Sequence, residues 1–484
     1  MYNYKILKSR ILSPLVCFVL VFFSIVTYAQ SPLKVDVKER VKTGDKITFK
    51  EWKAYDTYII DSLTEFSPSG HHVERSKYGF FTSLKGKKTG FYHTEKIGNR
   101  WWVIDPEGNA GINIMLNSVQ KGPSEKNKRA YASLYKDSFS WISATADLMF
   151  ENGFNGAGSW SDINSIRKYN QTSAKPIPYT IILNWMSGYG KKRGGTYQAV
   201  GHIGYPNQCI FVFDPEFESY CMEKAKELVL YAQDANLIGY FSDNELPLSK
   251  DNLNGYLKLP QTDPGYQAAI KWLSDNGISI NEITDKHKGE FAGYVAERYY
   301  STVLKAIKTY DPNHMYLGSR LYASSPHTKS IIEACARNVD IITINYYNNW
   351  ELRKAHLENW LNWSDKPFQV TEFYTKSEDT GMKNTSGAGW IVKTQKDRGY
   401  AYQHFCMSLL NATNCVGWHW FKYMDNDPEY QQAEPSNVDA NKGIVDNNYI
   451  PYDDLLLLMK QLNDNYMDII NYFSSNQGAI IQAE

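Results

Sequence analysis

The fold is first indicated by residues 237–247, which read L-I-G-Y-F-S-D-N-E-L-P. The apolar run is typical of a strand buried on both faces, and Asp243, Asn244 and Glu245 follow it before a proline ends the segment. Residues 366–374, K-P-F-Q-V-T-E-F-Y, repeat this pattern and place Glu372 at the end of a second strand. The carboxyl ends of parallel barrel strands form one face, so both segments predict carboxylates at the same mouth.

Short apolar segments alternate with amphipathic helical segments from about residue 100 onward, which indicates βα units and a parallel sheet. Eight segments are predicted as strands: 110–116, 154–158, 179–184, 237–242, 315–319, 341–345, 368–371 and 415–420. Helical patterns lie between them, as in residues 216–235 and 290–310. We therefore predict an α/β fold, a (β/α)8 TIM barrel with long βα loops. A doubly wound open sheet is the alternative, which the lack of a Gly-rich phosphate loop after an early strand disfavours.

The N-terminus has the features of a secretory signal peptide. Lys5, Lys8 and Arg10 precede an apolar run over residues 11–26, and Ala29 fits the small residue before a cleavage site. We expect residues 1–29 to be removed, residues 30–85 to form an irregular extension packed on the barrel, and residues 86–484 to form the barrel. The expected location is periplasmic or extracellular, without membrane attachment after cleavage. An uncleaved membrane anchor is the alternative.

The composition indicates a globular protein without affinity for nucleic acid. The 484 residues include 52 lysines and arginines and 52 aspartates and glutamates, so the formal net charge is zero. Six cysteines are too few for a disulfide-built scaffold, and we expect most of them to be buried as small hydrophobic residues. Asp425 and Asp427 suggest a calcium loop, but the required glycine is missing, so no metal or other cofactor is expected. The 36 tyrosines and 13 tryptophans provide faces on which sugar rings stack.

Two carboxylates that face each other across a barrel mouth are what retaining cleavage of a glycosidic bond requires. One serves as acid and then as base, and the other as nucleophile, with the two carboxyl groups about 5–5.5 Å apart. Glu245 and Glu372, after the fourth and seventh predicted strands, are the candidates for this pair.

Longer motifs extend this pattern over the chain from about residue 86. They are R-W-W-V-I-D-P-E-G-N (100–109), G-Y-F-S-D-N-E-L (239–246), T-Y-D-P-N-H-M-Y-L-G-S-R (309–320), V-T-E-F-Y (370–374), N-T-S-G-A-G-W-I-V-K-T-Q-K-D-R-G (384–399) and V-G-W-H-W-F-K-Y-M-D-N-D (416–427). Together they resemble glycoside hydrolase family 50, the β-agarase-like family of clan A. The resemblance implies that Glu245 is the acid/base, that Glu372 is the nucleophile, and that Asn244 binds the sugar 2-hydroxyl.

Further residues at strand ends are candidates for substrate binding. Clan enzymes place after the sixth strand a tyrosine that donates to the nucleophile, and we favour Tyr346 over Tyr347 for this role. We expect Trp418 to form the floor under the reacting sugar, with Trp420 as the alternative. Arg320 is expected to bind a hydroxyl or to orient a carboxylate. The remaining candidates follow the second and third strands: Trp160, Asp162, Asn184, Trp185, Tyr189 and His202.

The predicted function is hydrolysis of β-galactosidic linkages in an agar-type red-algal galactan, an oligo- or polysaccharide substrate. Removal of the signal leaves a slightly acidic chain, which favours neutral agarose over heavily sulfated carrageenan. The alternatives are another β-galactoside, such as carrageenan, porphyran or a simple β-galactoside, and a barrel that binds sugar without cleaving it.

Overall fold

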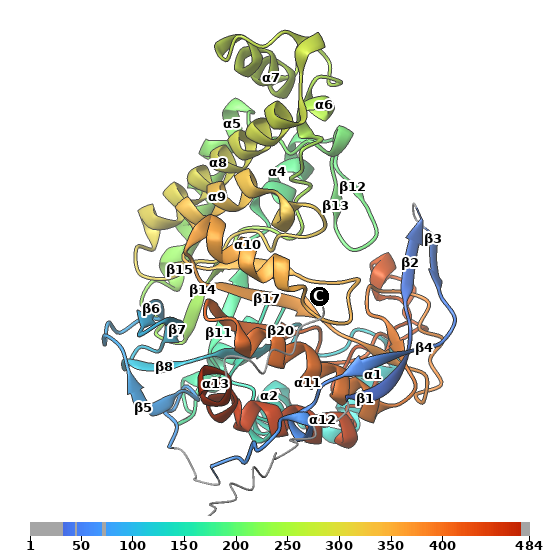
Figure 1. Ribbon diagram of the computed structural model, residues 1–484. Coiled ribbons are helices and arrows are strands. Elements are labelled where there is room, and N and C mark those ends of the chain that lie inside the picture. The colour runs from blue at the N-terminus through green and yellow to red at the C-terminus, as the bar shows by residue number, and fades with distance from the viewer. Residues whose placement is uncertain (1–31, 44–45, 70–73, 476–484) are drawn as a thin grey trace, which may run out of the picture.

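The computed structural model describes residues 32–43, 46–69 and 74–475 and contains a parallel barrel (Figure 1). Its strands are β9 (Asn113–Leu116), β10 (Gly156–Ala157), β11 (Tyr179–Ile182), β14 (Leu237–Phe241), β15 (Met315–Tyr316), β16 (Ile342–Asn345), β17 (Phe368–Phe373) and β20 (Cys415–Trp420). They lie in the order β15-β14-β11-β10-β9-β20-β17-β16, so strands that follow one another in the chain are neighbours. A parallel bridge between Leu321, which follows β15, and Ile344 on β16 joins the two ends of this order. The predicted (β/α)8 fold is confirmed.

The observed elements differ from the predicted ones mainly at their boundaries. The first predicted strand, 110–116, is two strands, because β8 (Asn109–Gly111) belongs to a separate antiparallel sheet and only β9 enters the barrel. The predicted helix 216–235 ends early: α5 (Pro215–Ala225) continues as the 3-10 helix η3 (Lys226–Leu230). The predicted helix 290–310 lies within α8 (Asp285–Tyr310).

Helices surround the barrel, and one group extends it at one end. The remaining helices are α1 (Glu125–Leu134), α2 (Ser138–Glu151), α3 (Ile163–Asn170), α4 (Trp185–Arg193), α6 (Asn252–Tyr256), α7 (Pro264–Asp275), α9 (Lys329–Asn338), α10 (Lys354–Ser364), α11 (Gln395–Asn411), α12 (Asp453–Asp464) and α13 (Tyr466–Ser475). Figure 1 shows α6, α7 and part of α8 standing away from the barrel at the top of the view. In the described part of the chain, no helix combines the length and the apolar character that a membrane crossing requires.

The described segments outside the barrel form one mixed sheet, one antiparallel sheet and two hairpins. β1 (Leu33–Lys38) pairs with β4 (Lys53–Thr57) and with β19 (Ile391–Val392), and β19 pairs with β18 (Lys376–Ser377). The second sheet has the order β5 (Phe81–Lys85), β8, β7 (Arg100–Ile104), β6 (His93–Ile97). The described residues before 85 thus contain paired strands, although their sequence pattern is irregular. Residues 1–29, predicted as a signal peptide, lie outside the described residues.

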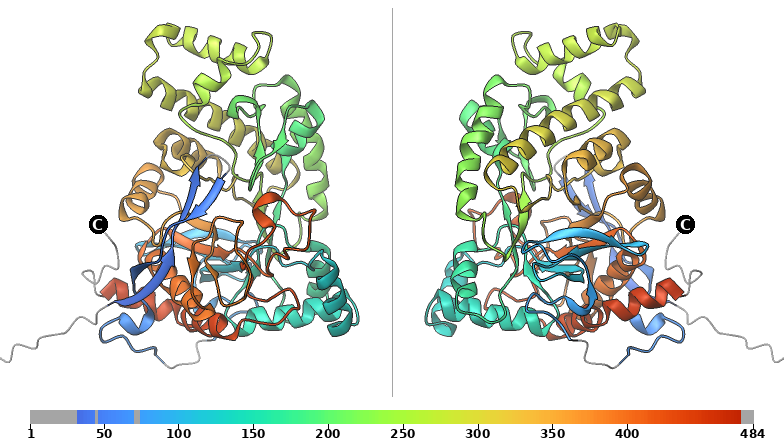
Figure 2. Two further views of the ribbon diagram at one scale, coloured as in Figure 1. Left: turned by 90° about the vertical axis from the view of Figure 1, so that its right-hand side faces the viewer. Right: turned by 90° about the vertical axis from the view of Figure 1, so that its left-hand side faces the viewer.

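Two hairpins stand at the end of the barrel that carries the candidate site. They are β2–β3 (Arg40–Thr43 and Lys46–Phe49) and β12–β13 (Tyr197–Gln198 and Ile203–Gly204). Figures 1 and 2 show both rising on the same side of the molecule. They bring residues that are far apart in sequence to one mouth.

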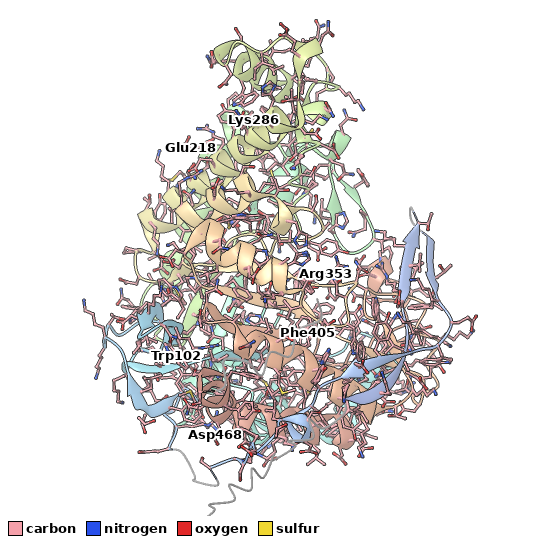
Figure 3. All side chains as sticks on the ribbon, viewed as in Figure 1. Trp102, Glu218, Lys286, Arg353, Phe405 and Asp468 are labelled. Carbon is pink, nitrogen blue, oxygen red and sulfur yellow. The ribbon has the colours of Figure 1, made fainter. Side chains whose placement is uncertain are left out.

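Apolar side chains fill the space between the barrel and its helices, and Figure 3 draws the described side chains on the ribbon. Phe405 of α11, labelled there, stacks on Phe373 of β17 with ring centroids 4.3 Å apart. The five cysteines in the described residues are free and buried, as expected. This packing fixes the strand ends on which the candidate site is built.

Candidate active site

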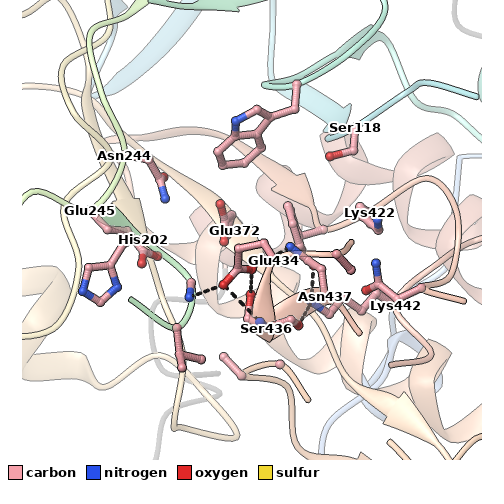
Figure 4. Close-up of a pocket in the computed structure, with 18 of the residues that line it drawn as sticks. Ser118, His202, Asn244, Glu245, Glu372, Lys422, Glu434, Ser436, Asn437 and Lys442 are labelled. Carbon is pink, nitrogen blue, oxygen red and sulfur yellow. Dashed lines mark hydrogen bonds between the residues drawn. The ribbon is translucent and has the colours of Figure 1, made fainter. Parts of the chain in front are cut away.

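A pocket of about 640 Å³ lies at the carboxyl ends of the barrel strands (Figure 4). Its lining includes Glu245 and Glu372, the two carboxylates expected from the sequence, together with Asn244. Asn244 and Glu245 lie in the loop after β14, and Glu372 is the penultimate residue of β17. The structure therefore brings the predicted pair into one cavity.

Glu372 is held between two donors. The hydroxyl of Tyr347 donates to Oε2 at 2.7 Å, and Nη2 of Arg320 lies 2.8 Å from Oε1. The Glu372 side chain is only 8% exposed. Each carboxylate oxygen therefore has a fixed partner, which leaves the group one orientation toward the pocket.

Glu245 lies in a different environment. Its Oε1 accepts a hydrogen bond of 2.8 Å from Nδ2 of Asn345. Burial and then the negative charge of Glu372 raise the pKa of Glu245 to about 8. The residue is thus a protonated carboxylic acid at neutral pH, able to give a proton to a group in the pocket.

Arg320 connects the loop that carries Glu245 with the strand that carries Glu372. Its guanidinium donates to the Thr371 carbonyl at 2.8 Å and to Oδ1 of Asn244 at 3.1 Å, besides pairing with Glu372. It is fully buried and lies 4.4 Å from the ring centroid of Trp160. Arg320 therefore orients a carboxylate, which is one of its two expected roles.

The amide of Asn244 is oriented by these contacts. Its Oδ1 accepts from Arg320 and, at 3.3 Å, from Asn345, while its Nδ2 has no hydrogen-bond partner in the described part of the chain. Asn244 lines the pocket, so this NH₂ group is available to a ligand hydroxyl.

The backbone adopts the left-handed region at the strand ends that build the site. Glu245, Arg320, Trp160 and Asn184 have φ values of 51°, 54°, 61° and 54°. Such conformations cost free energy in non-glycine residues and cluster at functional sites. They aim these side chains in directions that strand alternation does not predict.

The expectation for Tyr346 is corrected. Its hydroxyl lies 2.9 Å from Nδ1 of His356 and its ring packs against Trp360, away from the pocket. Tyr347 lines the pocket and donates to Glu372 instead. The register of β16 shifts between Ile344 and Asn345, so simple alternation assigns the wrong tyrosine.

The expectation for Trp418 is also corrected. It is fully buried, its Nε1 donates to the Tyr402 hydroxyl at 2.8 Å, and it is absent from the pocket lining. Trp420, the alternative, is buried as well and donates to the carbonyl of Lys442. Both tryptophans pack behind the strand ends, so the eighth strand does not supply the aromatic floor.

The other candidates divide between the pocket and the packing around it. Trp160, Asn184 and His202 line the pocket. Trp185 is 4% exposed and packs in the core. Asp162 caps α3, and Tyr189 bonds to Asp214, so neither contributes to the lining.

Several pocket residues were missed from the sequence. They are Tyr322, Tyr374, Phe421, Lys422, Glu434 and Lys442. Tyr374 and Phe421 lie within quoted motifs, and each directly follows a barrel strand, β17 or β20, so this position was a usable signal. Nothing local distinguishes Glu434 or Lys442 from ordinary loop residues.

Asp425, suggested from the sequence as part of a calcium loop, is occupied by protein donors. It accepts hydrogen bonds from Nδ2 of Asn441, from Gly443 N at 2.7 Å and from the Tyr452 hydroxyl at 2.6 Å. No group of three or more metal-ligating side chains is found among the residues that the structure describes.

Comparison with known proteins gives two curated relatives, both from Vibrio sp. strain JT0107. β-Agarase B is 25% identical over 492 residues, covering 81% of this chain and 50% of that protein. β-Agarase A is 33% identical over 365 residues, covering 64% of this chain and 34% of that protein. The chain thus spans half or less of these relatives. No family model matches.

Solved structures are similar over more of their length. The crystal structure of BpGH50 has a TM-score of 0.80 and 32% identity, covering 92% of this chain and 98% of that one. An exo-β-agarase structure with a TM-score of 0.66 and 21% identity, covering 85% and 70%, shares the fold. Because the match to BpGH50 extends over nearly the whole of both chains, this chain belongs to glycoside hydrolase family 50.

Proposed function

We propose that this protein is a retaining glycoside hydrolase that cleaves β-galactosidic linkages of an agar-type galactan, with Glu245 as acid/base and Glu372 as nucleophile. The observation that carries the proposal is the unequal environment of two carboxylates in one pocket. Glu372 is bound by a guanidinium and a phenol, whereas the pKa of Glu245 is raised to about 8 by burial and by its partner. This difference in environment supports Glu245 as the acid and Glu372 as the nucleophile.

The first step forms a covalent sugar–enzyme ester. An oxygen of Glu372 attacks the anomeric carbon, the bond from that carbon to the bridging oxygen breaks, and Glu245 gives its proton to the departing oxygen. Tyr347 and Arg320 keep the attacking carboxylate in place. The NH₂ group of Asn244 is free to bind the sugar 2-hydroxyl, an interaction that strengthens in the transition state.

The second step releases the sugar. Glu245, now ionised, takes a proton from water as the water oxygen attacks the anomeric carbon, and the bond to Glu372 breaks. The cycle restores both residues to their starting protonation states. The proposal needs no metal and no redox cofactor.

The relatives support agarose as the first substrate to test, since two curated ones are named β-agarases. The pocket wall supports a sugar ligand, because the rings of Trp160, Tyr322, Tyr374 and Phe421 line it. The signal-like N-terminus supports a periplasmic or extracellular location, where a polysaccharide is accessible.

The test is turnover by two single variants on agarose and on an activated aryl β-galactoside, with new reducing ends as the readout. Glu372→Ala is expected to lose activity on both. Glu245→Ala is expected to lose activity on agarose but to recover part of it on the activated substrate with azide, which replaces water without needing a base. Full activity in either variant refutes the assignment, and tight binding of agarose without new reducing ends by the wild type indicates a binding protein.

A further inference from the structure

The pocket holds three cations that the proposed reaction does not use: Arg40, Lys422 and Lys442. They come from separate parts of the chain. Arg40 begins the β2–β3 hairpin, Lys422 lies two residues after β20, and Lys442 lies in the loop before α12. Figure 4 shows the amines of Lys422 and Lys442 side by side, across Glu372 from Glu245 in that view.

None of the three is neutralised by the protein. In the ranges that the structure describes, no carboxylate forms a salt bridge within 4 Å of any of them. Lys442 donates only to neutral acceptors, the Ser436 carbonyl at 2.8 Å and Oδ1 of Asn437 at 2.7 Å. The Lys422 ammonium has no hydrogen-bond partner within the same ranges.

The nearest acids are bound to other donors. Glu434 accepts from Gly201 N at 2.6 Å, from Ser436 N at 3.0 Å and from Nδ2 of Asn437 at 3.0 Å. Asp425 is saturated by the donors described above. Both carboxylates are thus fixed in positions that leave the two ammonium groups without a counter-ion.

This arrangement is electrostatically unfavourable in the empty pocket. Burial lowers the pKa of Lys422 to about 8, and burial followed by repulsion from Lys422 lowers the pKa of Lys442 to about 7. Lys442 is 1% exposed, so bulk water provides little screening. An anion between the ammonium groups would relieve both effects and would restore their full charge.

We propose that Lys422, Lys442 and Arg40 form a subsite for an oxyanion carried by a sugar ring of the galactan, either a sulfate ester or a carboxylate. The inference rests on the proposed function, because it places this ring in the pocket together with the scissile linkage. The positive charge of the subsite is local, because the whole chain has a formal net charge of zero. The substrate class is therefore an acidic agar-type galactan.

The experiment compares three galacto-oligosaccharides of equal length: a neutral one, one with a sulfate ester and one with a carboxylate. The measured quantity is kcat/KM for each, expressed as the ratio of anionic to neutral substrate. The wild type is expected to favour at least one anionic substrate, and the preferred one identifies the anion. Lys422→Gln is expected to reduce that ratio about 10- to 100-fold, the range for a charge-assisted hydrogen bond.

Two further variants make the result specific. Lys422→Arg keeps the charge and should keep most of the preference, which distinguishes a lost contact from a damaged fold. Lys271→Gln removes one positive charge from an exposed lysine paired with Asp275 on α7, and it should leave the ratio unchanged.

The failure of the two proposals can be told apart. If the neutral oligosaccharide is cleaved as well as both anionic ones, or if Lys422→Gln leaves the ratio unchanged, the anion subsite is refuted while the proposed function stands. If no galactan is cleaved, the proposed function fails, and calorimetric binding of the three oligosaccharides to the wild-type protein decides the subsite. Equal affinity for neutral and anionic ligands then refutes it.

Discussion

Replacing Glu245 by glutamine should stabilise this protein at neutral pH. Glutamine is nearly isosteric, and its Oε1 can still accept the hydrogen bond from Asn345. The wild-type residue has an ordinary pKa of 4.5 in the unfolded chain and about 8 in the folded protein. Folding at pH 7 therefore forces a carboxylate to take up a proton, which the variant avoids.

The magnitude follows from the distance between pH 7 and the ordinary pKa of 4.5. Each pH unit corresponds to about 1.36 kcal/mol, so the proton uptake costs the wild type about 3 kcal/mol at pH 7. The sign follows from the raised folded pKa. The wild-type protein is free of this cost below about pH 4.5, where Glu245 is protonated in both the folded and the unfolded chain. It loses stability relative to the variant as the pH rises toward about 8.

The assay is chemical denaturation of wild type and Glu245→Gln at pH 5, 6, 7 and 8. The stability difference should be small at pH 5 and should grow by about 1 kcal/mol per pH unit up to pH 7. Glu282→Gln, at an exposed position before α8, provides a control that should show no such growth. A constant difference between pH 5 and 8, or a variant less stable than the wild type at pH 7, would refute the reasoning.

Three more predictions concern the same pocket. First, kcat/KM on agarose should fall as the pH rises past about 8, because Glu245 must carry a proton to act as the acid; a rate that keeps rising to pH 10 contradicts this role. Second, Tyr347→Phe should lower kcat about 10- to 100-fold by removing a charge-assisted hydrogen bond, whereas Tyr346→Phe should leave kcat within about twofold; steady-state kinetics of both variants check this. Third, Trp418→Phe should lower the free energy of unfolding by about 2–3 kcal/mol with KM unchanged, and Trp160→Ala should raise KM; equal effects of the two on KM would restore Trp418 as a substrate contact.

The sequence alone predicted the barrel and the carboxylate pair. An apolar β-branched run followed by a polar cluster is a local pattern, and the carboxyl ends of parallel strands share one face whatever the side chains around them. Glu245 and Glu372 were therefore found from their positions after two strands. The first barrel strand was predicted too long. The apolar pattern of residues 110–116 continues from β8 into β9, although the two strands belong to different sheets.

The tertiary structure decided which neighbouring side chains reach the pocket. The choice between Tyr346 and Tyr347 depends on a register shift in β16, and Trp418 is turned into the core by its contact with Tyr402. The direction of a side chain at a strand end depends on how the strand pairs with its neighbours and on left-handed backbone conformations. The two-residue alternation of a strand sequence predicts neither of these.

The charge of the pocket was also decided only in three dimensions. The slightly acidic charge of the chain without its signal suggested a neutral substrate, but charges summed along a chain carry no positions. Folding brings Arg40 beside Lys422 and Lys442, which lie more than 380 residues further along the chain, while the nearby acids are bound elsewhere. Electrostatic energy depends on distance and on burial, so the sequence determined which charged side chains are present, and the fold determined the electrostatic field inside the pocket.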